Sequence, residues 1–176
     1  GQAPTTIVAP MAAKTFDLTV EVPVPDMANL DGGTIWPDVE ERIVDLIESH
    51  NSSLVFTNSR RLAERLTARL NEIHAERTGI ELPDGRNPQV GGGSPAQLLA
   101  SGQSHGAPTL LARAHHGSVS KEQRALVEDD LKSGRLRAVV ATSSLELGID
   151  MGAVDLVIQV EAPPSVASGL QRIGRA

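Results

Sequence analysis

Two short apolar runs near the end of the chain constrain its fold most strongly. Residues 138–141 and 156–160 are rich in valine and isoleucine, and each run has the length of a strand. Apolar runs without alternation are typical of strands buried on both faces, as in a parallel sheet. Small, polar or charged residues follow each run directly. Ligands of open α/β sheets bind where such strands end, so the sequence places a candidate site there.

The rest of the chain alternates between strand and helix patterns. Apolar and polar residues alternate over 15–22, which predicts a half-buried strand that Pro23 and Pro25 end. Further strands are predicted over 53–56 and 110–114, and helices over 36–50, 60–77 and 120–133, the last of them stopped by Gly134. This order predicts an α/β fold, a doubly wound parallel sheet flanked by helices.

Hydroxyl residues follow the first of the two apolar runs. Thr142, Ser143 and Ser144 precede a short helix predicted to start at residues 145–147. Such residues can cap a helix and leave backbone N–H groups directed at an anion, for which a phosphate is the natural occupant. Gly148 and Asp150 then close a turn that places a carboxylate near the same edge. A carboxylate there suits a ribose hydroxyl or a magnesium-bound water.

Arginines gather at the end of the chain. Gln171, Arg172 and Arg175 lie on a helix predicted to begin near Ser165. The two arginines are three residues apart and therefore occupy neighbouring helix faces. Their planar guanidinium groups suit phosphate oxygens.

Two strings in this region closely resemble motifs V and VI of the superfamily 2 helicases. They are TSSLELGID at 142–150 and QRIGRA at 171–176, and they occur in the family's order and separation. A lone Gly-Ile-Asp would be an ordinary strand-to-helix turn, but neither full string follows from composition. Within the superfamily, the chain is most similar to the large-helicase-related (Lhr) family of bacterial ATP-dependent helicases.

Two upstream segments extend the resemblance. VFTNSR at 55–60 is similar to helicase motif IV, and HHGS at 115–118 to the motif that holds the nucleic-acid backbone. Taken singly, Asn58 and Ser59 can be helix caps and Arg124 a solvated helix arginine. The resemblance implies that one strand of nucleic acid is bound by Thr57, Asn58, Ser59, Arg60, His116, Gly117, Ser118, Arg124, Thr142, Ser143 and Ser144.

The resemblance also implies a RecA-like motor. Residues 15–176 would form its second RecA-like domain, with 1–14 as a linker from a preceding domain and 83–108 as a flexible insertion. ATP would lie between the two domains, with Arg175 as an arginine finger and Gln171 at the γ-phosphate or the attacking water. Gly148, Asp150 and Arg172 would contact the nucleotide, although Arg172 can instead brace the motif.

Parts of the motor are absent from this sequence. No lysine follows a glycine, so there is no P-loop, and no Asp-Glu pair ends an apolar strand. The resemblance implies that the first RecA-like domain supplies the P-loop and most of the Mg²⁺ site. The chain ends inside motif VI, so we expect a fragment that does not hydrolyse ATP alone.

Composition restricts the class of function further. A net charge of -6 is opposite to that of most free-standing nucleic-acid-binding domains, but a motor domain that grips one strand through a few amides, hydroxyls and arginines tolerates it. There is no cysteine, which excludes disulfides, and no metal site is expected, since the His115–His116 pair would point to opposite faces of a strand. Neither a membrane span nor a secretory signal is found. The resemblance to the Lhr family implies a bacterial, nucleoid-associated protein, so a cytoplasmic location is expected.

The implied activity is 3′-to-5′ translocation on single-stranded nucleic acid, expected to be DNA, with unwinding of DNA or RNA:DNA duplexes. The implied partners within the same protein are the first RecA-like domain and further C-terminal domains. Two alternatives remain open: a superfamily 2 ATPase that remodels nucleoprotein without strand separation, and a non-catalytic nucleic-acid-binding module. A dehydrogenase-like domain is disfavoured because G-x-G-x-x-G is absent.

Overall fold

The computed structural model describes residues 15, 17–82, 110–146 and 154–176 of the chain. Its strands β1 (Ser53–Phe56), β2 (Ala112–His115), β3 (Ala138–Ala141) and β4 (Leu156–Gln159) form one parallel sheet in the order β2-β3-β1-β4. The helices are α1 (Trp36–Glu48), α2 (Arg60–Thr78), α4 (Lys121–Lys132) and α5 (Val166–Ile173), with 3-10 turns η1 (Asp31–Gly33) and η2 (Ser143–Leu145). The predicted α/β fold, a parallel sheet flanked by helices, is confirmed.

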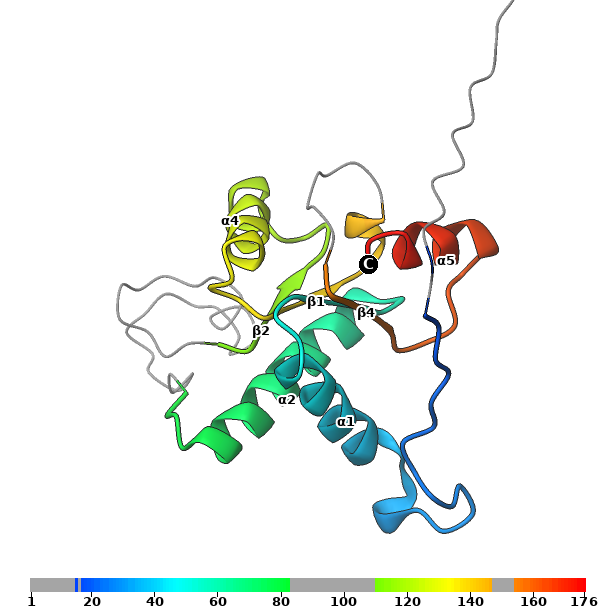
Figure 1. Ribbon diagram of the computed structural model, residues 1–176. Coiled ribbons are helices and arrows are strands. Elements are labelled where there is room, and N and C mark those ends of the chain that lie inside the picture. The colour runs from blue at the N-terminus through cyan, green and yellow to red at the C-terminus, as the bar shows by residue number, and fades with distance from the viewer. Residues whose placement is uncertain (1–14, 16, 83–109, 147–153) are drawn as a thin grey trace, which may run out of the picture.

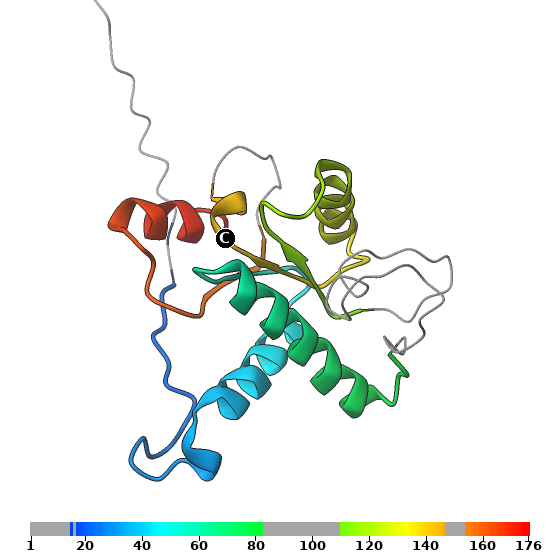
Figure 2. The same cartoon turned by 180° about the vertical axis from the view of Figure 1, so that it is seen from behind.

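Helices cover both faces of the sheet (Figures 1 and 2). Val55 and Val140 pack with α1 and α2 on one face, whereas Leu54, Phe56 and Val139 pack with α4 and η2 on the other. Successive side chains of a strand point to opposite faces, so both faces of these strands need apolar residues. This explains why β1 and β3, at the centre of the sheet, show no polar alternation in sequence.

Strand β4 differs from the prediction of burial on both faces. It lies at one edge of the described sheet, and all of its residues are half-buried. Ile158 packs against the α1 and α2 cluster and Val157 against the other cluster, so each face is covered in part. The run of apolar residues indicated a strand with two covered faces but could not indicate its position at an edge.

The strand predicted over residues 15–22 is wrong. Thr15 and residues 17–22 form no strand, and Leu18, Val20 and Val22 are 70%, 90% and 58% exposed. An ion pair of 2.7 Å between Arg42 Nε and Glu21 Oε1 links the segment to α1. Alternation describes which side chains a strand would present to each face, but a strand also needs a neighbouring backbone to pair with. No described segment lies in register to provide one.

Serine residues begin three of the helices. The Oγ atoms of Ser59, Ser120 and Ser165 each accept the backbone N–H three residues further on, at 3.1–3.2 Å. Each bond satisfies a donor that has no partner within the helix. After α2 and α4 the chain turns at Gly79 and Gly134, whose φ angles of 70° and 74° favour glycine. The predicted helix start near Ser165 and the stop at Gly134 are confirmed.

A side chain of α2 closes the edge of the described sheet at β2. Asn71 is buried, its Nδ2 donates to Ala112 O at 2.9 Å, and its Oδ1 accepts from Ala112 N–H at 3.0 Å. The N–H and C=O of Ala112 face away from β3, where they would otherwise lack a partner. One carboxamide thus replaces the backbone of a further strand and fixes α2 against β2.

We expect Asn71→Ala to lower the free energy of unfolding by about 2–4 kcal/mol, because it leaves a buried N–H and a buried C=O without partners. Urea denaturation of the two proteins measures the difference. Asn51→Ala is a matched control at an exposed position and should change the value by less than about 0.5 kcal/mol. Equal effects of the two substitutions would contradict the role given to Asn71.

Candidate functional site

The predicted strand-binding segments meet at the carboxyl edge of the sheet. Thr57 N–H donates to Ala141 O at 2.9 Å, and Thr142 N–H donates to His115 O at 3.3 Å. Thr57 and Thr142 therefore follow neighbouring strands at the same end of the sheet, as a shared site requires. The backbone pairing of β1, β2 and β3 alone brings these distant parts of the sequence together.

A side-chain contact joins two of the loops at this edge. The guanidinium of Arg60, in the first turn of α2, donates to Ser118 Oγ, in the loop between β2 and α4. Both residues are exposed, as are Gly117 and Ser143. Arg124 is half-buried on α4, and its Nε has no hydrogen-bond partner within the described part of the chain. Arg60, Gly117, Ser118 and Ser143 thus form a stretch of exposed donors along one edge, and Arg124 lies partly buried.

Other predicted contact residues are engaged inside the domain. Thr57 is fully buried, and its hydroxyl donates to Ser59 O at 3.1 Å. Ser144 Oγ donates to His115 O at 2.9 Å, and Ser59 caps α2. In this structure these hydroxyls hold the loops in place. Thr142 differs, because its half-buried side chain makes no capping bond to η2.

His116 supports the loop that carries Gly117 and Ser118. Its Nδ1 accepts the N–H of Ser118 at 3.3 Å, and its Nε2 lies 3.1 Å from Glu64 Oε1 on α2. Burial lowers the pKa of His116 from its ordinary value, although the Glu64 carboxylate acts in the opposite direction. A neutral ring with its proton on Nε2 satisfies both contacts.

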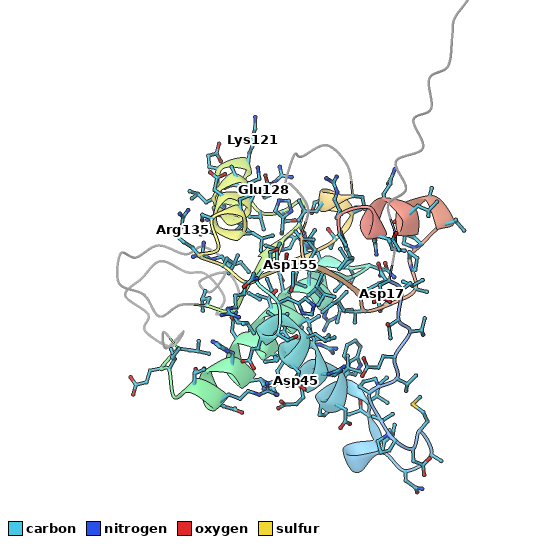
Figure 3. The ribbon with its side chains drawn as sticks, in the orientation of Figure 1. Asp17, Asp45, Lys121, Glu128, Arg135 and Asp155 are labelled. Atoms are coloured by element: carbon cyan, nitrogen blue, oxygen red, sulfur yellow. The ribbon has the colours of Figure 1, made fainter. Side chains whose placement is uncertain are left out.

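His115 points to the other face of the sheet, as predicted for the pair. Its Nε2 lies 2.9 Å from Glu128 Oε1 on α4, and its Nδ1 lies 2.8 Å from Ser144 Oγ (Figure 3 labels Glu128). Desolvation by burial lowers the pKa of His115 and outweighs the opposing effect of Glu128. His115 thus connects the end of β2 to α4, whereas His116 connects the loop after β2 to α2. The two rings therefore share no ligand position.

Arg172 lies in the interior, only 2% exposed. Its Nε donates to Glu146 Oε1 at 2.6 Å, and its NH1 donates to Asn58 Oδ1 at 3.1 Å and to Gln159 Oε1 at 2.9 Å. The guanidinium also lies over the ring of Phe56, 5.2 Å from its centroid. Between the two roles considered for Arg172, this position favours bracing of the motif over direct contact with a nucleotide.

Arg175 lies just beyond α5 and not on the helix, which ends at Ile173. One of its guanidinium nitrogens donates to Glu146 O at 2.9 Å, and its carbonyl accepts Val154 N–H at 3.1 Å. Glu146 and Val154 flank the stretch 147–153, which holds Gly148 and Asp150. Those two predicted contacts lie outside the described residues. Gln171 is exposed on α5, and the helix as a whole lies beside η2 in both views (Figures 1 and 2).

Comparison with known proteins identifies this arrangement. The model of the helicase conserved C-terminal domain family matches residues 98–176. The whole chain is 86% identical to the Lhr helicase of Mycolicibacterium smegmatis and 50% identical to the Lhr helicase/uracil glycosylase of Escherichia coli. The chain spans 12% of the length of each of these curated relatives. The chain belongs to the Lhr helicase family and corresponds to the helicase C-terminal domain of these proteins.

Solved structures support the same assignment. The Lhr domain superposes on the Mycobacterium smegmatis helicase Lhr bound to ssDNA and AMP-PNP with a TM-score of 0.78 and 76% identity. That match covers 100% of this chain and 19% of the other. Saccharomyces cerevisiae Dbp5, bound to RNA and ADP BeF3, matches 79% of this chain and 29% of its own at a TM-score of 0.51 and 20% identity. The second likeness shows the RecA-like fold alone.

Sequence reasoning missed three residues of the Lhr domain that hold its site together. Glu146, Gln159 and Ser168 all belong to the hydrogen-bonded group around Arg172. They come from the end of η2, from β4 and from α5, so no local spacing in the sequence links them. The one sequence feature that could have indicated this group is Glu146 itself, because it is a charged residue between Leu145 and Leu147.

Among the described residues, no helix combines the length and the apolar character that a membrane crossing requires.

We expect the domain to lose stability as the pH falls below about 6.5. Both histidines have a lowered pKa in the folded state, so unfolding takes up protons in this range. The contribution of the two histidines to the free energy of unfolding should therefore be fully present above their pKa in the unfolded state. Below that pKa, the free energy of unfolding should decrease by at most about 1.4 kcal/mol per pH unit for each histidine. Urea denaturation between pH 7.5 and 5 measures the slope. A double variant, His115→Gln with His116→Gln, should have a flatter profile, and an equally steep one would contradict this origin.

Proposed function

We propose that this domain is the C-terminal motor half of an ATP-dependent helicase that moves 3′ to 5′ on single-stranded DNA and unwinds DNA or RNA:DNA duplexes. The observation that carries the proposal is a contact between the two sets of predicted residues. The turn after β3 begins with Thr142 of the strand-binding set and ends at Glu146, whose backbone carbonyl accepts from the Arg175 guanidinium at 2.9 Å. The structure of a relative bound to ssDNA and AMP-PNP supports a role of the domain toward both a nucleic-acid strand and a nucleotide.

The nucleic-acid side of the proposal rests on backbone contacts. Arg60, Gly117, Ser118, Thr142 and Ser143 offer guanidinium, hydroxyl and amide donors, which suit phosphate oxygens. Aromatic residues are 2% of the chain, too few for a platform on which bases stack. The domain would therefore grip a strand with little base specificity and with marked salt dependence.

The nucleotide side rests on Arg175. A guanidinium placed beside the γ-phosphate stabilises charge that is redistributed as the phosphoryl bond breaks, an effect of about 10³ to 10⁵ in rate. Arg175 is held by contacts to both described flanks of the segment 147–153, to which Asp150 belongs. The exposed Gln171 on α5 would contact the γ-phosphate or the attacking water. ATP and Mg²⁺ would be bound mainly by a preceding RecA-like domain, which would also complete the cleft.

Replacement of the finger tests the nucleotide side in the full-length protein. We expect Arg175→Ala to lower the ssDNA-stimulated ATPase kcat by about 10³ or more, with the Kd for single-stranded DNA changed by less than about threefold. Unwinding of a duplex with a 3′ tail should be lost as well. Retained turnover would remove the finger assignment. A wild-type protein that hydrolyses ATP on DNA yet separates no strands would instead favour a remodelling ATPase.

The strand contacts can be tested by the salt dependence of binding. Thr142→Val combined with Arg60→Ala should weaken single-strand affinity and reduce the slope of log K against log salt by about 0.7 for each phosphate that the variant no longer neutralises. Arg137→Ala is a matched control for charge, because Arg137 precedes β3 at the opposite edge of the sheet. The control should leave the slope unchanged. An unchanged slope in the double variant would argue against these contacts.

A further inference from the structure

Glu146 occupies the junction between η2 and α5. Its Oε1 accepts from Arg172 Nε and from Ser168 Oγ, both at 2.6 Å, and its backbone carbonyl accepts from the Arg175 guanidinium at 2.9 Å. The side chain of Glu146 is only 12% exposed. One residue thus makes contacts to three side chains of the segment that carries the proposed finger.

The carboxylate of Glu146 is the group that neutralises Arg172. The other polar partners of the Arg172 guanidinium, Asn58 Oδ1 and Gln159 Oε1, are uncharged. A buried guanidinium without a counter-charge is strongly destabilised, because it has lost the solvation that water would provide. Removal of the Glu146 charge therefore disfavours the present position of Arg172, and α5 must shift or admit water.

Glu146 is attached to α5 at two points. Ser168 and Arg172 are four residues apart, so they lie on the same face of the helix one turn from each other. Glu146 binds both, and Arg175 follows only two residues after the last residue of α5. A change in the position of this helix face therefore displaces Arg175. Small displacements of a catalytic group of about 1 Å can lower rates by about 10²-fold.

We propose that Glu146 is a positioning residue for ATP hydrolysis, whose carboxylate fixes α5 through Arg172 and Ser168 and so presents Arg175 to the nucleotide. The inference rests on the proposed role of Arg175. In this scheme Glu146 does not touch the nucleotide, and it acts only through its contacts to the segment that holds Arg172 and Arg175. Its effect should therefore appear in kcat and depend on Arg175.

The test uses Glu146→Gln in the full-length protein, a change that keeps the size of the side chain and removes its charge. We expect kcat to fall about 10- to 100-fold, with KM for ATP and Kd for single-stranded DNA within about threefold of the wild type. In the Arg175→Ala background the same change should alter kcat by less than about twofold, since there is no finger left to position. Ser168→Ala, which removes one hydrogen bond and no charge, should lower kcat by a few fold and serves if Glu146→Gln does not fold.

Glu40→Gln is the matched control. Glu40 is also a buried carboxylate paired with an arginine, since its Oε2 lies 3.3 Å from Arg69 Nε. It lies on α1, across the sheet from α4 and η2 (Figure 1). The control should lower the melting temperature to a similar extent and leave kcat unchanged, which separates positioning from general loss of stability.

The outcomes are distinct. Wild-type kcat in folded Glu146→Gln and Ser168→Ala, together with loss of turnover in Arg175→Ala, would overturn the role of Glu146 and leave the proposed function intact. An equal fall of kcat in the presence and absence of Arg175 would also overturn it. Retained turnover in Arg175→Ala would overturn the finger itself.

Discussion

A buried positive charge organises the carboxyl edge of this domain. Arg172 is almost inaccessible to solvent, and its burial is stabilised because Glu146 neutralises it and Asn58 and Gln159 accept hydrogen bonds from its NH1. These partners come from separate elements of the fold. The pair therefore fixes how the end of β1, the turn after β3, strand β4 and helix α5 sit relative to each other. The position of the proposed finger, Arg175, depends on this arrangement.

The histidine pair has a comparable role on the strand-binding side. His115 and His116 are neighbours in sequence, yet one is bound to Glu128 on α4 and the other to Glu64 on α2 (Figure 3 shows Glu128). They hold the loop after β2 between the two helical layers, and burial lowers the pKa of each. The loop with Gly117 and Ser118, which we propose to contact a phosphate, is thus fixed from beneath. The proposed contact groups are exposed, whereas the buried groups keep them in place.

Much of the fold could be predicted because its central strands are buried on both faces. The apolar runs of β1 and β3 and the helix start near Ser165 are local signals, and the structure has them where they were expected. The failure at residues 15–22 is equally physical. Alternating residues there fit a strand, but pairing depends on a neighbour that the local sequence cannot supply. Edge and centre are likewise indistinguishable in sequence, so the partial exposure of β4 was missed.

The sequence by itself determined the kind of site. Its hydroxyls and arginines follow parallel strands, and the strings around Thr142 and Arg175 carry the family resemblance. Only the tertiary structure decided which of these side chains are exposed and which are internal supports. Arg172 and Arg175 are alike in sequence, but one lies inside against Glu146 and Asn58 while the other follows the end of α5. The physical reason is that burial and charge pairing join residues distant along the chain, and local spacing holds no record of those contacts.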